Sequence, residues 1–292
     1  MEWVFLAFIS ALLSAIAAVS QKKVLFDLDA LEFSFVLSIF NMLFSLLFFL
    51  WVDFSDITAL SLVLLYIKTI FGALAFLCVM LAIKNMEISG ALPLLALTPG
   101  FVAIAAFVFL GESLSIFELI GMGLLLFGTY LLESGNKKDL LHPFKIFASS
   151  KYHHYILLAL LLFTTTSIMD KLLLKNHSLH PYAFMGFQQL FIAINFSIII
   201  LFVRKSYKMV VRNTLQKSFL WILVISILTI GYRYTQIEAI KLAPVALVLS
   251  VKRISVFFAV IFGGRLFKEH NLFIKVLATV ILILGAIFII NS

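Results

Sequence analysis

The sequence predicts an all-α integral membrane protein whose ten transmembrane helices form two inverted five-helix repeats. Three observations lead to this prediction: a composition that is 63% hydrophobic and 12% charged, ten apolar segments of membrane-spanning length, and a correspondence between the two halves of the 292-residue chain. Ordinary soluble domains carry about 25% charged residues, roughly twice the share found here. The composition therefore excludes a soluble globular domain.

A transmembrane helix needs about 20 mainly apolar residues to cross the hydrocarbon core of a bilayer. The segments that meet this requirement are about 3–21, 33–52, 59–82, 89–110, 115–133, 154–174, 182–203, 218–239, 244–264 and 271–290. They use most of the chain, so no separate extramembrane domain is expected. The one cysteine, Cys78, lies inside the third segment, which excludes an intrachain disulfide.

The widest polar stretch, Glu133–His153, divides the spans five and five. We therefore expect a first five-helix repeat at residues 1–134, a connecting loop at 135–152 and a second five-helix repeat at 153–292.

The two halves correspond at a single offset of 157 residues without a gap. The matched residues are Ala82-Ile83-Lys84 with Ala239-Ile240-Lys241, Glu112 with Glu269, and Gly128 with Gly285. Polar matches at both ends of one helix favour a duplication. Because each repeat holds an odd number of spans, the second copy must enter the membrane from the opposite side. Transporters commonly have this inverted arrangement, with the substrate bound near the midplane.

The net charge of +8 is concentrated in alternate gaps between the predicted spans. The odd-numbered gaps hold most of the lysines and arginines, whereas the even-numbered gaps hold only Lys175 and Lys241. By the positive-inside bias, the odd gaps are cytoplasmic and both termini lie outside. Charge in short loops indicates contact with anionic membrane lipid rather than with nucleic acid.

Ionisable residues inside a membrane are costly, and they usually line a cavity or pair with one another. Lys252 and Arg253 stand side by side roughly 8 residues, or about 12 Å, into the span predicted at 244–264. We expect this pair to form the centre of an anion-binding site. The alternative is that one or both reach the headgroups, or are neutralised by Glu238 or Asp170.

The preceding predicted helix carries three further candidates. Arg233, with Tyr234 beside it, would extend the anion-binding site, or it would pair with Glu238 or Asp170. Glu238 is also the candidate for carrying a coupling proton, because acidic residues inside membrane spans serve in proton relays.

Two more substrate-binding candidates lie on other predicted helices. Lys68 lies in the middle of the third span, and Gln188 lies on the seventh. An amide such as that of Gln188 serves packing between membrane helices equally well. No catalytic residue and no cofactor are expected. No metal site is expected either, because the six histidines lie in or beside loops without the spacing of metal ligands.

A glutamate between the fourth and fifth spans of each half, followed by a helix that bears small residues, resembles the tandem EamA-type domain of the drug/metabolite transporter superfamily. The residues that carry this resemblance are Gly111-Glu112, Gly121 and Gly128 in the first half, and Phe267-Lys268-Glu269, Ala278 and Gly285 in the second. Small residues let helix backbones approach closely, so the fifth and tenth helices are expected to pack together.

The sequence departs from the family pattern at two positions. Val256 replaces the helix proline of the second half, and Lys268 replaces the glycine before the glutamate. The resemblance implies a multi-pass protein of a bacterial or archaeal cell (inner) membrane, with both termini in the cytoplasm. The loop charges predict the opposite orientation, so the topology stays open.

A narrower resemblance concerns the segment Ser250–Val256, which contains Lys252 and Arg253. It is similar to the lysine-arginine pair on the ninth helix of the plastid phosphate translocators of the same superfamily. That resemblance implies that the pair binds a phosphate group of the substrate.

We therefore expect a secondary active transporter of a small polar, anionic metabolite, working by alternating access. The first alternative is an exporter of amino acids or drugs with proton coupling. A polytopic membrane enzyme, or a channel or lipid flippase with the same fold, is the alternative of another class. The sequence contains no Walker A motif, so direct use of ATP by this chain is not expected. Whether the protein forms a homodimer stays open.

Overall fold

The computed structural model describes residues 2–54, 57–98, 100–101, 104, 115–134, 149–176, 179–204, 206–242, 248, 251–252 and 254–290. Within these ranges, the side chains at 118, 133–134, 171, 175–176, 240–241 and 289–290 are not described.

The described part of the chain contains ten apolar helices, one at each position where the sequence predicts a span. They are α1 (Glu2–Leu25), α2 (Ala30–Ser45) continued by the 3₁₀ helix η1 (Leu46–Trp51), α3 (Ala59–Asn85), α4 (Ile88–Leu94) continued by the 3₁₀ helix η2 (Leu95–Leu97), α6 (Ile116–Ser134), α8 (Lys151–Lys171) continued by the π-helical turn η3 (Leu172–Asn176), α9 (Pro181–Val203), α10 (Tyr207–Leu242), α12 (Ile254–Leu266) and α13 (Leu272–Ile290). Six of them are long and apolar enough to cross a membrane, and four are shorter apolar helices.

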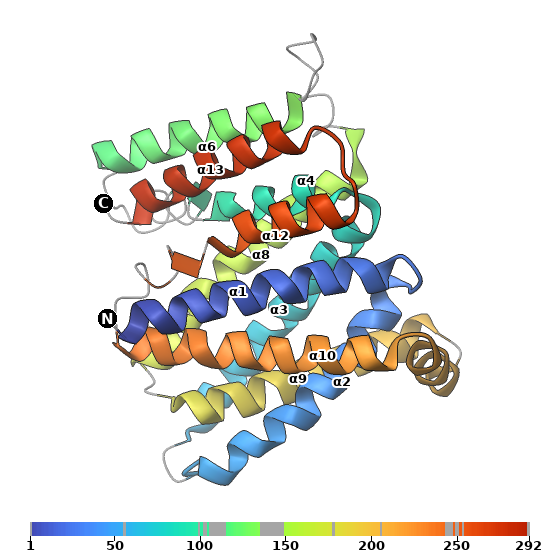
Figure 1. The fold of residues 1–292 in the computed structure, drawn as a ribbon. Helices are drawn as coiled ribbons and strands as arrows, with labels where there is room; N and C mark the ends of the chain where they lie inside the picture. The colour runs from blue at the N-terminus through green and yellow to red at the C-terminus, as the bar shows by residue number, and fades with distance from the viewer. Residues whose placement is uncertain are drawn as a thin grey trace.

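The prediction of ten apolar helices is confirmed, but α10 begins earlier than expected. The prediction placed the start of this span at about residue 218. The chain is in fact helical from Tyr207, and the break lies at Ser218, whose φ of −146° and ψ of 27° are not helical. The segment before Ser218 turns across the direction of the rest of α10 (Figure 1).

Each helix of the first half packs against one of the second half. The packed pairs are α1 with α10, α2 with α9, α3 with α8, α4 with α12, and α6 with α13. Figure 1 shows α6 and α13 side by side at one edge of the bundle and α1 beside α10 near its middle. The start of α1 and the end of α13 lie at the same end of the bundle, as an even number of spans requires.

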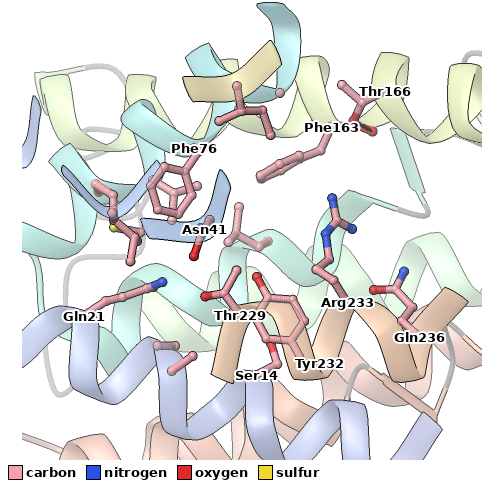
Figure 2. A pocket seen from close by; sticks show the side chains of 18 of the residues that line it. Ser14, Gln21, Asn41, Phe76, Phe163, Thr166, Thr229, Tyr232, Arg233 and Gln236 are labelled. Carbon is pink, nitrogen blue, oxygen red and sulfur yellow. Dashed lines mark hydrogen bonds between the residues drawn. The ribbon is translucent and has the colours of Figure 1, made fainter. Parts of the chain in front are cut away.

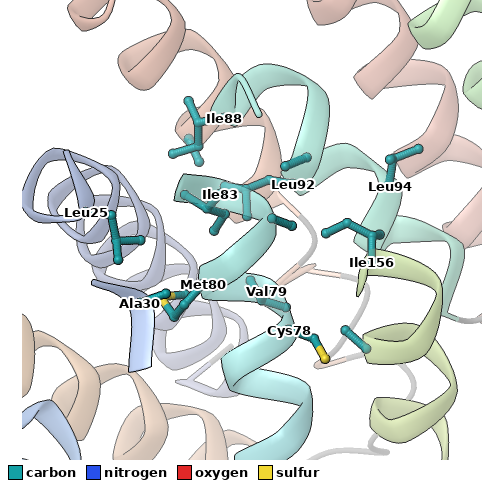
Figure 3. Close-up of a cluster of buried hydrophobic side chains, with 14 of the residues drawn as sticks. Leu25, Ala30, Cys78, Val79, Met80, Ile83, Ile88, Leu92, Leu94 and Ile156 are labelled. Carbon is teal, nitrogen blue, oxygen red and sulfur yellow. The ribbon is translucent and has the colours of Figure 1, made fainter. Parts of the chain in front are cut away.

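Apolar side chains fill the opposite end of the bundle, where α1 and α3 end and α4 begins. Leu25, Met80, Ile83 and Ile88 are almost completely buried there and belong to one contiguous cluster, seen in Figure 3. Burying a large aliphatic side chain contributes roughly 1.5–3 kcal/mol of hydrophobic free energy when it leaves water. In this end of the bundle the same packing fixes the relative positions of three helices that line the cavity described below.

A buried cation and a half-buried carboxylate hold the helix ends at this end of the bundle. The ammonium group of Lys22 donates to the carbonyl oxygens of Ile83 at 2.6 Å and Met86 at 2.7 Å, which satisfies backbone groups that the end of α3 leaves unpaired. The carboxylate of Glu269 accepts the backbone N–H groups of Ile88 at 2.6 Å and Ser89 at 2.9 Å. Glu269 therefore caps α4, and it ties the second half of the chain to the first.

Lys268, which stands where the family pattern has glycine, has a φ of 52°. This left-handed backbone is the conformation that glycine adopts at low cost and that other residues adopt rarely. The turn that presents Glu269 to α4 thus has a backbone conformation that favours glycine, although a lysine stands there.

The predicted packing of the fifth against the tenth helix is confirmed at Gly128 and Gly285. A Cβ atom built on Gly285 would lie 2.8 Å from the carbonyl oxygen of Gly121 and 3.0 Å from the Cβ of Leu124, both on α6. A Cβ on Gly128 would lie 2.8 Å from Cγ of Leu282 on α13. The backbones of α6 and α13 therefore approach each other more closely than side chains at these positions allow.

Gly285→Ala is expected to destabilise the protein by about 1–3 kcal/mol, because the added methyl group meets backbone atoms that cannot move aside. The measurement is the apparent melting temperature in detergent. Gly123→Ala on α6 is the matched control, since a Cβ there meets nothing within 4 Å. Equal melting temperatures for the two variants would contradict the close packing.

A central cavity as the candidate functional site

A cavity of about 380 Å³ lies between the two halves of the chain. Its described lining comes from α1, α2, α3, the α4–η2 segment, α8, α9, α10 and α12. Among the described residues, α6 and α13 contribute none to this lining, in keeping with their position at the edge of the bundle. The volume falls within the range of about 300–1,000 Å³ that is usual for small-molecule sites.

Four of the predicted site residues line this cavity. They are Lys68, Gln188, Arg233 and Lys252. Arg253 lies outside the described residues, so its part in the site stays a prediction. Lys252 is helical and lies two residues before the described start of α12.

Tyr234 and Glu238 are not among the described residues that line the cavity. The ring of Tyr234 stacks on Phe48 and on Tyr182, with ring centroids 5.7 Å and 6.3 Å away. Glu238 is half-buried on the same helix and acts electrostatically on Tyr234. Their roles in binding and coupling therefore stay predictions.

Lys68, on α3, is buried in a set of contacts from α8 and α9. Its ammonium group lies 2.7 Å from the carboxylate of Asp170 on α8, donates to Oε1 of Gln188 on α9, and sits 4.7 Å from the ring centre of Phe184. The side chain of Lys68 is 4% exposed, whereas that of Asp170 is 31% exposed. Both side chains line the cavity, and the carboxylate is the more exposed of the two.

Lys252 lines the cavity just before α12, and its ammonium group contacts two residues of α10. It donates to Oε1 of Gln236, and its ammonium group lies 4.9 Å from the ring centre of Tyr232. Gln236 and Tyr232 also line the cavity, and Figure 2 shows both beside Arg233. An ammonium group over an aromatic face is attracted by the ring.

Arg233 extends from α10 into the cavity between Thr166 and Gln236 (Figure 2). Among the described residues, no carboxylate lies within ion-pair distance of the guanidinium group of Arg233, and no group forms a hydrogen bond with it. The group does act electrostatically on Lys68, which it repels. A half-buried guanidinium without a counter-ion leaves five N–H donors available to an anion.

The charge of the described lining is strongly asymmetric, since it holds three cations and one carboxylate: Lys68, Arg233, Lys252 and Asp170. Holding three cations inside an apolar bundle is costly unless an anion compensates them. The arrangement therefore favours a negatively charged ligand.

Neutral polar groups on the first two helices complete the site, and the sequence analysis missed them. They are Ser14, Gln21, Ser34, Ser38 and Asn41. Among the described residues, no hydrogen-bond partner reaches the carbonyl oxygen of Asn41, which is 7% exposed, or the amide nitrogen of Gln188, which is 1% exposed. Buried polar atoms are normally paired, so these two are free to bind a ligand group.

A signal for the missed residues does exist in the sequence. Ser34, Ser38 and Asn41 follow one another at spacings of four and three, which places them on one face of a helix. Phe76 and Phe163, which face the cavity from α3 and α8 in Figure 2, carry no such signal, because phenylalanine is abundant throughout the chain.

Polar side chains enclosed by helices whose outer faces are apolar define this chain as an integral, multi-pass membrane transporter. The pattern of the EamA-like transporter family matches residues 1–134 and 150–291. These two tandem segments make up most of the chain, so the chain belongs to this family. Members of the family are transporters and not enzymes, and the predicted resemblance to tandem EamA-type domains is confirmed.

No curated protein matches this sequence. The chain is also similar to a protein whose crystal structure has been solved. The alignment covers 98% of this chain and 95% of the chain in that structure, with a TM-score of 0.62 and 14% identical residues. At this level of identity the similarity shows the fold alone.

Proposed function

We propose that this protein is a secondary active transporter of a small, polar, anionic metabolite. The observation that carries the proposal is Arg233, a cavity-lining guanidinium for which the described residues provide no carboxylate partner. Lys252 reaches the same cavity, where it donates to the amide of Gln236 and lies over the ring of Tyr232. Guanidinium and ammonium groups are the usual partners of carboxylates and phosphates, and arginine binds them in bidentate fashion.

We also propose that transport proceeds by alternating access between two inverted repeats, 1–134 and 153–292. The packing of the helices supports this proposal. If each helix of the first half is exchanged with the helix at the same place in the second half, the set of packed pairs stays the same. The offset of 157 residues further relates Leu95 to Lys252 and Thr98 to Ser255, and all four line the cavity. Rocking of two such halves about a central site is the usual mode of transporters with this arrangement.

The assay is counterflow in proteoliposomes over a panel of phosphorylated and carboxylated metabolites. Saturable exchange of one or more anions is expected. Conductance without saturation would favour a channel instead.

We place the protein in the cell (inner) membrane of a bacterium or archaeon, and accessibility of a C-terminal tag decides between the two orientations.

Lys252→Gln is expected to weaken anion binding by about tenfold, because one charge-assisted hydrogen bond is worth roughly 1.5–3 kcal/mol and each 1.4 kcal/mol is a factor of ten. The measurement is the concentration of anion that gives half-maximal counterflow. Lys208→Gln, which removes the same charge from an exposed position, is the control. Unchanged kinetics in the Lys252 variant would exclude it from the site.

An exporter of amino acids is the second candidate, and Asp170 is the observation that favours it. A carboxylate 31% exposed in a cavity that also holds Arg233 can bind the ammonium group of a zwitterion while the guanidinium binds its carboxylate. Competition of amino acids, but not of phosphorylated metabolites, for counterflow would support this candidate over the first.

A further inference from the structure

Among the described residues that line the cavity, Asp170 is the one carboxylate, and three lining residues are cations. Its oxygen lies 2.7 Å from the ammonium group of Lys68, and its side chain is more exposed than that of the lysine. The other contacts of Lys68, with the amide oxygen of Gln188 and the ring of Phe184, are with neutral groups. Asp170 is therefore the group that an incoming anion meets at Lys68.

An anion and Asp170 compete for the same cation. If an anion binds Lys68, a second negative charge is brought close to the carboxylate, and the two repel each other at short range in a site of low dielectric constant. The repulsion is removed when the carboxylate leaves Lys68 and takes up a proton. Ser167, one turn earlier on α8, also lines the cavity and offers a hydroxyl oxygen to which a protonated carboxyl group can donate.

We propose that Asp170 is the coupling carboxylate of this transporter: anion binding displaces it from Lys68, it takes up one proton from solution, and the anion and the proton cross together. This inference rests on the proposed anion transport. It replaces Glu238 as the coupling candidate, because Asp170 lines the cavity and is paired with a cavity cation.

The groups around Asp170 fit this role. The helical elements packed against α8 are α3, α4, η2 and η3. Lys68 is the charged residue that α3 presents to the cavity, and α4 and η2 carry no titratable residue. The side chain of Lys175 on η3 lies outside the described ones. Across the cavity, Arg233 and Lys252 are cations, so the proton goes to the carboxylate.

The test measures proton uptake when sulfate binds to the purified protein in weakly buffered detergent solution. Sulfate stays fully ionised near neutral pH, so any proton that disappears has gone to the protein. The wild type is expected to take up about one proton per sulfate, and its affinity is expected to fall about tenfold per pH unit as the pH rises, which is the linkage for one coupled proton. Asp170→Asn keeps an acceptor for Lys68, and it is expected to bind sulfate more tightly at alkaline pH, without proton uptake.

The outcomes distinguish a failure of the coupling role of Asp170 from a failure of the proposed anion site. Sulfate binding by the wild type without proton uptake would overturn the coupling role and leave the anion site intact. Proton uptake that persists in Asp170→Asn but is lost in Glu238→Gln would assign the proton to Glu238 and overturn the role of Asp170. Absence of sulfate binding to the wild type would overturn the anion site, and the coupling with it. If Asp170→Asn does not fold, the double variant Lys68→Gln/Asp170→Asn, which lacks both charges, is expected to bind sulfate more weakly than the wild type, through Arg233 and Lys252, and without proton uptake. Proton uptake by this variant would overturn the role of Asp170.

Discussion

Arg233→Gln is expected to reduce anion transport by about tenfold to a hundredfold. A hydrogen bond to a charged group is worth roughly 1.5–3 kcal/mol, and a bidentate contact places two of them on one anion. Because the described residues supply no carboxylate partner for Arg233, its removal leaves no protein charge stranded in the cavity. The loss should therefore show in transport and not in stability. The measurement is counterflow of the best anion from the panel, with the melting temperature in detergent recorded in parallel.

Two further variants sharpen this test. Arg233→Lys keeps the charge but loses the planar pair of donors, so it should retain part of the activity. Arg265→Gln removes an equal charge from an exposed position on α12, and its transport should equal that of the wild type. Full activity of Arg233→Gln, or an equal loss in Arg265→Gln, would contradict an anion site at Arg233.

The fold was largely predictable because the bilayer imposes a length on each helix. Ten apolar segments, read by length and hydropathy, coincide with the ten helices of the described chain. Gly128 and Gly285 showed in advance which pair packs most closely, because small residues are needed wherever two backbones meet. The start of α10 was missed because length and hydropathy recognise a span, but not a polar helical turn that precedes it.

The site was predictable only for residues that stand out against an apolar background. Lys68, Arg233 and Lys252 are conspicuous because charge is rare in a membrane helix, and all three line the cavity. The sequence alone, however, could not say which charges neutralise each other. Asp170 was one of two candidate partners for the cations of the eighth and ninth predicted helices, and the fold instead pairs it with Lys68, about a hundred residues away. Such pairing depends on helix packing, which span prediction does not determine.

Lys68→Gln is expected to be the most destabilising of the charge removals. Breaking a buried ion pair by removing one partner typically costs about 3–5 kcal/mol, because the remaining charge stays behind without compensation. The side chain of Asp170 is 31% exposed and therefore not fully desolvated, so a loss near the lower end, about 3 kcal/mol, is expected. The measurement is the melting temperature in detergent, with Lys208→Gln at an exposed position as the control.

The double variant Lys68→Gln/Asp170→Asn separates the loss of the pair from the cost of the stranded charge. Replacing both partners by neutral amides removes the attraction and the uncompensated carboxylate together, so much of the lost stability should return. Anion binding at Lys68 should not return with it, because the cation is gone in both variants. A double variant that is as unstable as Lys68→Gln alone would show that Lys68 stabilises the bundle through Gln188 and Phe184 rather than through its pair with Asp170.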